Sequence, residues 1–280
     1  MAGTIKRKFS LGISPCPNDT FMFDALTNRR IDTEDLAFEV HHEDVETLNR
    51  LALEGRFDIT KISFALYPAI RKNYQLLTSG SALGLGVGPL LVSKRKMSDP
   101  KREIKTLAFP GEHTTAFLLF RKFFSGEYEL KEMVFSEIEQ AVLDGRADAG
   151  VIIHESRFTY ESKGLKKIAD LGSLWEESTG MPVPLGGIAV KRSLGGNTIT
   201  MINSLVGKSV EFAMNHPNES RDYVKEHAQE MSDDVIDQHI GLYVNEHSLR
   251  LTGDARLAIL QLINESSSTE QANPAFADEA

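Results

Sequence analysis

The sequence predicts an α/β fold of two lobes that are joined by two crossover strands. The first observation is an internal repeat: residues 53–59 read LEGRFDI and residues 143–149 read LDGRADA, an offset of 90 residues. Each copy follows a helix-like segment and precedes an apolar segment. Such a pattern indicates a helix that ends at a glycine, a short turn and then a strand. The two copies therefore predict the same local structure, once in each lobe.

The second observation is an alternation of strand-like and helix-like segments. FSLGIS leads through the loop PCPND into the helical run TFMFDALTN, and KTLAFP leads through GEH into TTAFLLFRKFF. Alternation of this kind implies βαβ units and a parallel sheet in each half. Ligands of such sheets bind at the carboxyl ends of the strands, against the N-termini of helices.

The third observation is a pair of apolar segments that begin with glycine and proline. GVGPLLVSK at residues 86–94 and PVPLGGIAVK at residues 182–191 have the pattern of hinge strands, one leaving the first lobe and one returning to it. We therefore predict a first lobe from residues 1–90 and 190–280, and a second lobe from residues 91–189. This is the architecture of type II periplasmic binding proteins, whose lobes close on a ligand by hinge motion.

The chain from about residue 197 onward has a helical pattern. One helical run stops at Pro217, and further helices are expected near Asn218, after Ser232 and after Thr252, each with a residue suited to an N-cap. The last residues, 266–280, are mostly small and polar. They predict a disordered or loosely docked tail.

Composition limits the partners of the chain. The net charge is −9 and no basic stripe is present, which argues against a nucleic-acid partner. A single cysteine fits a reducing compartment. No apolar run approaches the roughly 20 residues that cross a bilayer, and the basic N-terminus lacks the apolar run of a signal peptide. We expect a cytoplasmic protein with no membrane partner.

The segment GVIIHES, residues 150–156, ends an apolar strand on His154. Two interpretations are open, because this histidine either bonds to a nearby carbonyl as a structural group or titrates as part of a site. Glu155 points to the opposite face if the strand continues.

The loop SPCPNDTF places Asn18 near a helix start. A capping role and a bond to a ligand are equally open for Asn18. Cys16, between two prolines in the same loop, is either an incidental cysteine or a thiol nucleophile paired with His154.

The loop PGEHTTAF places Thr114 and Thr115 at another helix start, with His113 beside them. One threonine is expected to cap the helix. A helix N-terminus with two hydroxyl groups is also a site for a carboxylate, and we favour that function.

The segment ITKISFALYP places Lys61 and Ser63 on one face of a strand and Ile62 on the other. A lysine among apolar residues needs a partner, so Lys61 lies at a wet strand end or faces an anionic ligand. The sequence contains no metal-ligand spacing, glycine-rich phosphate loop or nucleotide fingerprint. We expect neither a metal nor an organic cofactor.

Five segments together resemble the 1,4-dihydroxy-6-naphthoate synthase family of the futalosine route to menaquinone. They are SPCPNDTFMF, DITKISFALYP, PGEHTTAFLLF, DAGVIIHESRFTY and MPVPLGGIAVKR. The resemblance implies a two-lobed cytosolic carbon–carbon lyase that converts cyclic dehypoxanthine futalosine to 1,4-dihydroxy-6-naphthoate and dihydroxyacetone without a cofactor. It also implies that His154 is the base, and that Lys61, Ile62, Ser63, Thr114 and Thr115 contact a small anionic substrate.

Two alternatives remain open at this point. Chorismate dehydratase of the same pathway has the same fold and also binds a carboxylate, although SPCPNDTF and VIIHE fit the synthase better. A cytosolic protein that binds a small anion without turning it over is the alternative from another functional class.

Overall fold

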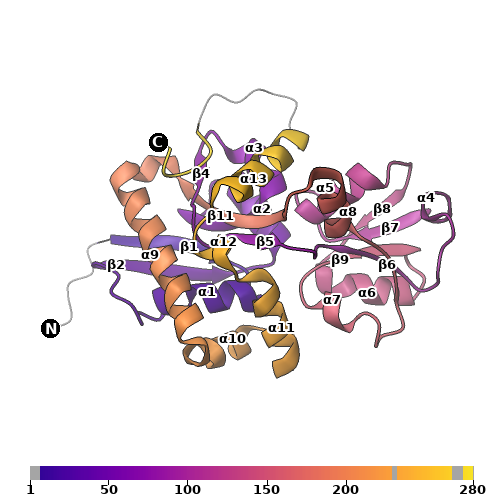
Figure 1. Ribbon diagram of the computed structural model, residues 1–280, viewed down its shortest axis with the longest axis horizontal. Helices are drawn as coiled ribbons and strands as arrows, with labels where there is room; N and C mark the ends of the chain where they lie inside the picture. Colours follow the sequence, from indigo (N-terminus) through magenta and orange to yellow (C-terminus); the bar gives the residue numbers. More distant parts are fainter. Residues whose placement is uncertain (1–6, 229–231, 267–273, 280) are drawn as a thin grey trace.

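Two mixed β-sheets form the framework of the protein in the computed structural model, which describes residues 7–228, 232–266 and 274–279 (Figure 1). Within these residues the first sheet has the order β2-β1-β3-β11-β4, with β5 paired to β11. Its strands are β1 (Arg7–Ile13), β2 (Leu36–His42), β3 (Ile59–Ser63), β4 (Tyr74–Leu76), β5 (Ala82–Gly84) and β11 (Val183–Lys191). The second sheet has the order β10-β6-β9-β7-β8. Its strands are β6 (Leu90–Ser93), β7 (Thr106–Phe109), β8 (Glu129–Glu132), β9 (Ala149–Ile152) and β10 (Lys166–Asp170).

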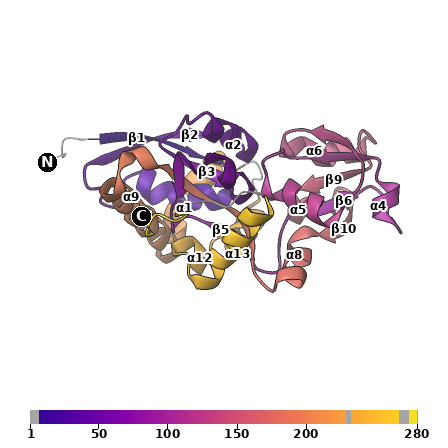
Figure 2. The same cartoon turned by 90° about the horizontal axis from the view of Figure 1, so that it is seen from above.

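The two sheets lie side by side along the long axis of the molecule, as Figure 2 shows from above. The lobe limits that the sequence suggests, at residues 90 and 190, stay a prediction. The parallel pairing predicted for each half is confirmed, because β1 runs parallel to β2 and β3, and β7 runs parallel to β8 and β9. The two crossover strands differ, since β6 runs antiparallel to β9 and β11 runs antiparallel to β3. The chain passes between the two sheets on the side where the carboxyl ends of their parallel strands lie. A strand that enters a sheet from that side must therefore run antiparallel to the strands it joins.

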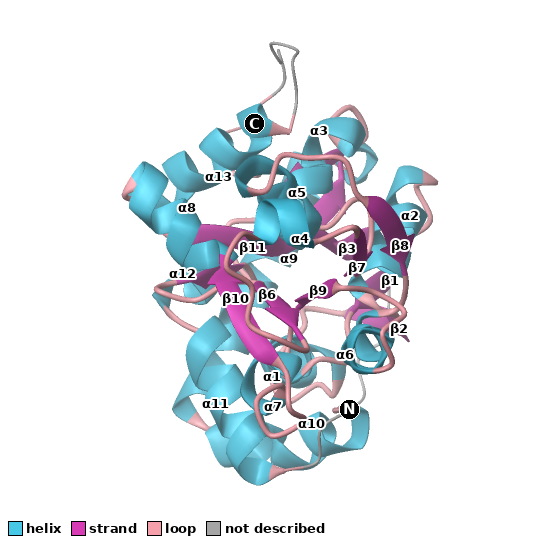
Figure 3. Cartoon of the chain, turned by 90° about the vertical axis from the view of Figure 1, so that its right-hand side faces the viewer, coloured by secondary structure: helices cyan, strands magenta, loops and turns pink. Residues whose placement is uncertain are grey.

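Short helices surround the two sheets. Beside the first sheet are α1 (Pro17–Thr27), α2 (Val45–Leu53), the 3₁₀ turn η1 (Phe64–Leu66) and α3 (Tyr67–Ile70). The second sheet carries α4 (Pro100–Glu103), α5 (Thr115–Phe123), α6 (Phe135–Leu143), α7 (Ser156–Thr159) and α8 (Leu171–Thr179). In Figure 3, which looks onto the end of the second sheet, α5 and α8 lie on one side of its strands and α6 and α7 on the other.

The internal repeat of the sequence is a repeat of structure. α2 and α6 both end two residues before a glycine, and these glycines, Gly55 and Gly145, take φ values of 69° and 75°. Glycine suits this left-handed conformation because it has no Cβ atom to clash with the backbone. β3 and β9 follow these turns. The predicted succession of helix, glycine, turn and strand is confirmed in both copies.

The C-terminal part of the chain is helical and returns to the first sheet (Figure 1). It comprises η2 (Arg192–Leu194), α9 (Gly196–Asn215), η3 (Pro217–Ser220), α10 (Arg221–His227), α11 (Asp233–Tyr243), α12 (Glu246–Leu249) and α13 (Gly253–Glu265). α9 packs on α1 through an apolar cluster that includes Phe23, Ile202 and Val206. These helices begin close to the positions that the sequence predicts.

The expectation of a disordered or loosely docked tail is wrong for residues 274–279, while residues 267–273 and 280 lie outside the described residues. Phe276 is fully buried and forms a parallel bridge with Leu76 of β4. The carbonyl of Ala275 accepts a hydrogen bond from the hydroxyl of Tyr67. One aromatic residue in a polar tail provides the apolar area that fixes this segment.

A second apolar cluster joins the two sheets. It includes Phe64 of η1, Phe120 of α5 and Leu262 of α13. α5 is thereby packed against both β11 and η1. No helix within the described residues is long and apolar enough to cross a membrane.

Candidate active site

A pocket whose empty volume, including space open to solvent, is about 660 Å³ lies between elements of the two sheets. Its polar lining comes from the ends of strands and the starts of helices, and comprises Ser14, Asn18, Asp19, Lys61, Ser63, Thr114, Thr115, His154, His239 and Tyr243. Seven residues were predicted from the sequence to bind the substrate or act as the base, and six of them line this pocket. These six are Asn18, Lys61, Ser63, Thr114, Thr115 and His154.

The seventh, Ile62, is placed elsewhere. Its side chain is fully buried in the apolar cluster, while Lys61 and Ser63 on the opposite face of β3 line the pocket. This is the alternation that the sequence predicts for the strand. Close packing of β3 against β11 is possible because Gly186 stands opposite Ser63, and a Cβ atom there would lie 2.7 Å from the carbonyl oxygen of Ile62.

His154 lies two residues beyond the end of β9. Its φ of 56° is left-handed, a conformation in which histidine is more common than most residues. The ring packs edge-on against Phe135, with 4.9 Å between the ring centroids, and Nε2 has no hydrogen-bond partner among the described residues. Burial lowers the pKa of His154 to about 4, outweighing the charge of Asp19, which raises it. The imidazole is therefore neutral at pH 7, with a lone pair available.

The left-handed turn at His154 also changes the place of Glu155. The strand ends at Ile152, so the condition under which Glu155 would point to the opposite face is not met. Donor atoms of Cys16, His154 and Glu155 lie within 4.8 Å of one another. Burial raises the pKa of the Cys16 thiol well above its usual value, and the charge of Glu155 adds to this rise. A protonated thiol is a poor nucleophile and a poor metal ligand.

Lys61 finds its partner inside the protein. Its Nζ atom lies 2.6 Å from Oδ1 of Asp19, and both side chains are buried. Asp19 also accepts a 2.7 Å hydrogen bond from the hydroxyl of Ser14. The charge of Lys61 is thus balanced within the pocket wall by Asp19, a partner that the sequence analysis did not name when it left a wet strand end and an anionic ligand open. A lysine on a buried strand and an aspartate at a helix start were the available signals.

Asn18 connects this ion pair to a residue from the far end of the chain. Its amide nitrogen donates to Oδ1 of Asp19 over 2.8 Å, and its amide oxygen lies 2.9 Å from Nε2 of His239. Asn18 does not cap α1, whose N-cap residue is Cys16. Sequence reasoning missed His239 and Tyr243. The signal was a histidine on the same helix face as Ile236, which is buried.

The start of α5 forms another wall of the pocket. Thr114 is the N-cap, as expected for one of the two threonines, and accepts a hydrogen bond from the Phe117 N–H. The two hydroxyl groups are used within the protein, because Thr114 donates to the Gly111 carbonyl and Thr115 donates to the Leu185 carbonyl. The first N–H groups of a helix have no partner within the helix, so those at the start of α5, including that of Ala116, are the candidate donors to an anion.

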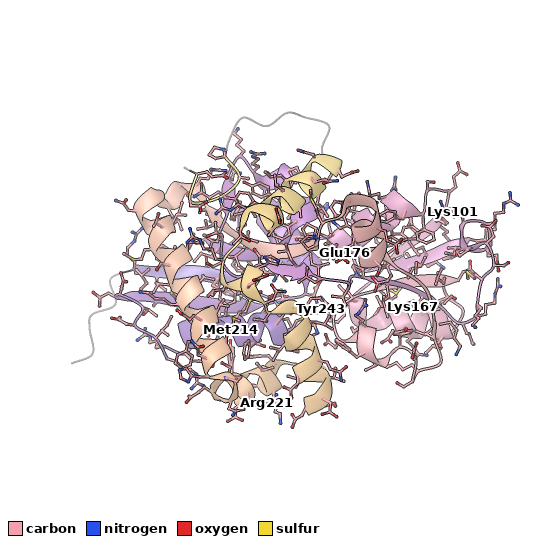
Figure 4. The ribbon with its side chains drawn as sticks, in the orientation of Figure 1. Lys101, Lys167, Glu176, Met214, Arg221 and Tyr243 are labelled. Atoms are coloured by element: carbon pink, nitrogen blue, oxygen red, sulfur yellow. The ribbon has the colours of Figure 1, made fainter. Side chains whose placement is uncertain are left out.

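Ser63 offers a hydroxyl proton to the pocket. Its Oγ atom accepts a 3.1 Å hydrogen bond from the Asn49 amide, and its own N–H donates to the Asn49 oxygen. The side chain is thereby fixed from behind. Tyr243, at the end of α11, is labelled in Figure 4 close to the junction of the two sheets.

Comparison with known proteins identifies the family. The family model described as menaquinone biosynthesis matches residues 9–267. A 1,4-dihydroxy-6-naphthoate synthase of Thermus thermophilus is 45% identical over 264 residues, 94% of this chain and 96% of that protein. The chain belongs to the 1,4-dihydroxy-6-naphthoate synthase family of menaquinone biosynthesis. A family member of the same name from Streptomyces coelicolor is 45% identical over 258 residues, 90% of each chain.

Solved structures agree with the two-lobed fold predicted for this family member. A protein of Archaeoglobus fulgidus matches with a TM-score of 0.87 at 33% identity, over 92% of this chain and 96% of that one. A Candida albicans protein with the generic periplasmic-binding-protein fold matches with a TM-score of 0.68 at 12% identity, over 95% and 92% of the two chains. The predicted fold class is confirmed.

Proposed function

We propose that the chain converts cyclic dehypoxanthine futalosine to 1,4-dihydroxy-6-naphthoate and dihydroxyacetone, as a cytoplasmic carbon–carbon lyase that uses no cofactor. Identity of 45% over nearly the whole of two synthases supports this reaction. The observation that carries the mechanism is a neutral histidine, His154, whose Nε2 atom has no partner among the described residues and which lines the pocket.

His154 is the general base of the proposed mechanism. Elimination of a three-carbon fragment with formation of an aromatic ring begins with loss of a proton from carbon or from a hydroxyl group. A neutral imidazole accepts that proton, and its protonated form returns it to the leaving fragment. The charges of Asp19 and Lys61 balance each other. Protonation of His154 is therefore the main change of charge in this part of the pocket during the reaction.

The substrate carboxylate binds at the start of α5. Backbone N–H groups of Thr115 and Ala116 carry the positive end of the helix dipole, and both residues line the pocket. Lys61 contributes less direct attraction than the sequence suggests, because Asp19 neutralises it. Ser63, fixed by Asn49, supplies one hydroxyl donor.

Incubation of the purified protein with cyclic dehypoxanthine futalosine tests the proposal. Chromatography should show 1,4-dihydroxy-6-naphthoate and an equal amount of dihydroxyacetone, in protein treated with a chelator as well as in untreated protein. Saturable binding without product would instead identify a binding protein. Loss of water from chorismate, with no reaction of the futalosine derivative, would identify the dehydratase.

A further inference from the structure

His239 has a place in the pocket that the proposed mechanism does not use. It comes from α11, is fully buried, and lies with its ring 6.2 Å from that of His154 and nearly parallel to it. The ring of Tyr243 packs against it at 4.8 Å and that of Phe158 at 6.4 Å. Aromatic groups from both parts of the molecule thus hold the imidazole in position.

The hydrogen bonds of Asn18 determine the tautomer of His239. The Asp19 carboxylate, which pairs with Lys61 over 2.6 Å, only accepts hydrogen bonds. The Asn18 group that faces Asp19 over 2.8 Å must then be the amide NH₂. The amide oxygen consequently faces His239, so Nε2 of His239 carries the proton and donates it to Asn18.

This tautomer leaves Nδ1 of His239 as an acceptor. Nδ1 is buried and has no hydrogen-bond partner among the described residues. Burial also lowers the pKa of His239 well below its usual value, with the neighbouring His154 and Lys61 adding to the effect, so the lone pair stays unprotonated at pH 7. A buried acceptor in a pocket wall without a partner favours a ligand that brings a donor.

We propose that Nδ1 of His239 accepts a hydrogen bond from a hydroxyl group of the bound substrate and of the naphthoate product. The inference rests on the proposed function and assigns the part of the ligand that α11 recognises. Carboxylates are excluded from this position because they lack a donor. Together, His154 and His239 present two neutral acceptors, which suits a ligand with several hydroxyl groups.

Two substitutions separate this role from a structural one. His239→Gln keeps an amide N–H near the Nε2 position, and so keeps the bond to Asn18, but removes the Nδ1 acceptor. His239→Asn puts an amide oxygen near the Nδ1 position and loses the bond to Asn18. Thermal unfolding of both variants checks that they fold.

Binding of two matched ligands provides the readout. Wild-type protein should bind 1,4-dihydroxy-6-naphthoate, kept reduced under argon, about tenfold more tightly than 2-naphthoate, which has the carboxylate but no hydroxyl groups. His239→Gln should lose most of this preference, and His239→Asn should keep it. A preference that survives in the Gln variant, or that is lost only in the Asn variant, would overturn the proposal.

This measurement does not depend on turnover. If the wild-type protein fails to convert the futalosine derivative, the proposed function fails while the ligand preference is still measured. If turnover occurs but the His239→Gln variant discriminates between the two naphthoates as the wild type does, only the role of His239 fails.

Discussion

His154 combines an unusual backbone conformation with an unusual proton affinity. Its left-handed φ of 56° turns the chain directly after β9 and brings Glu155 and Cys16 beside the ring. Non-glycine residues in this region carry strain of about 1–2 kcal/mol, which the packing of the surrounding residues must offset. This conformation agrees with the proposed role of His154 as the general base.

The pH dependence of kcat/KM reports the pKa of His154 in the enzyme without bound substrate. Its pKa of about 4 lies below the usual value of histidine, so protonation removes the base only in strongly acidic solution. We expect kcat/KM to fall as the pH drops through about 4 and to show no histidine limb near 6.5. A limb at the ordinary imidazole value would contradict the present assignment. Recovery of activity after return to pH 7 serves as the control for unfolding.

The Lys61–Asp19 pair should behave as a unit. Removal of one partner from a buried ion pair leaves an uncompensated charge and costs about 3–5 kcal/mol. We expect Asp19→Asn and Lys61→Met each to lower the free energy of unfolding in urea. The double variant should lose clearly less than the sum of the two losses. Strictly additive losses would show that the two charges do not interact.

At the scale of elements, the start of α5 depends on its cap. Thr114→Ala removes the bond to the Phe117 N–H, which should cost about 1 kcal/mol and loosen the N–H groups that hold the carboxylate. KM should rise several-fold while kcat changes little. Thr114→Ser keeps the cap and is the matched control. A wild-type KM in the Thr114→Ala protein would contradict the binding of the substrate carboxylate at the start of α5.

Local sequence patterns predicted the helices, turns and strands better than they predicted how these elements are arranged relative to one another. The glycines after α2 and α6 and the alternation of Lys61, Ile62 and Ser63 are short-range signals, and the structure agrees with them. The antiparallel direction of β11 depends on the side from which the chain enters the sheet. No local sequence pattern predicts that side. His239 joins the site only because α11 folds back over α1, so its contact with Asn18 could not be predicted from a sequence pattern.

At the scale of the whole molecule, polar contacts join the two sides of the pocket. The Glu46 carboxylate of α2 accepts a hydrogen bond from the His113 N–H, and Lys122 of α5 pairs with Glu265 of α13 over 2.7 Å. Thr115 bonds to the carbonyl of Leu185 in β11. These contacts come from segments far apart in sequence. They hold together the segments that surround the pocket.

Buried histidines should also make the whole protein sensitive to acid. Burial lowers the pKa of both His42 and His154 to about 4, and it lowers the pKa of His239 well below its usual value. At pH values below about 6.5, the pKa of histidine in the unfolded chain, the unfolded chain binds more protons than the folded one. The free energy of unfolding therefore decreases as the pH is lowered. Urea unfolding should show this loss between pH 6.5 and 4, and a smaller loss in His42→Gln. A free energy of unfolding that stays constant over this range would contradict the assignment.

The central claim is that His154 removes the proton that starts the reaction. The most direct measurement is single-turnover conversion of cyclic dehypoxanthine futalosine by the His154→Asn variant, because asparagine also tolerates the left-handed backbone. Substrate binding and the unfolding temperature should stay close to those of the wild type, while the rate constant should fall by about 10²–10⁴. A variant that folds, binds substrate and retains most of its rate would contradict the claim.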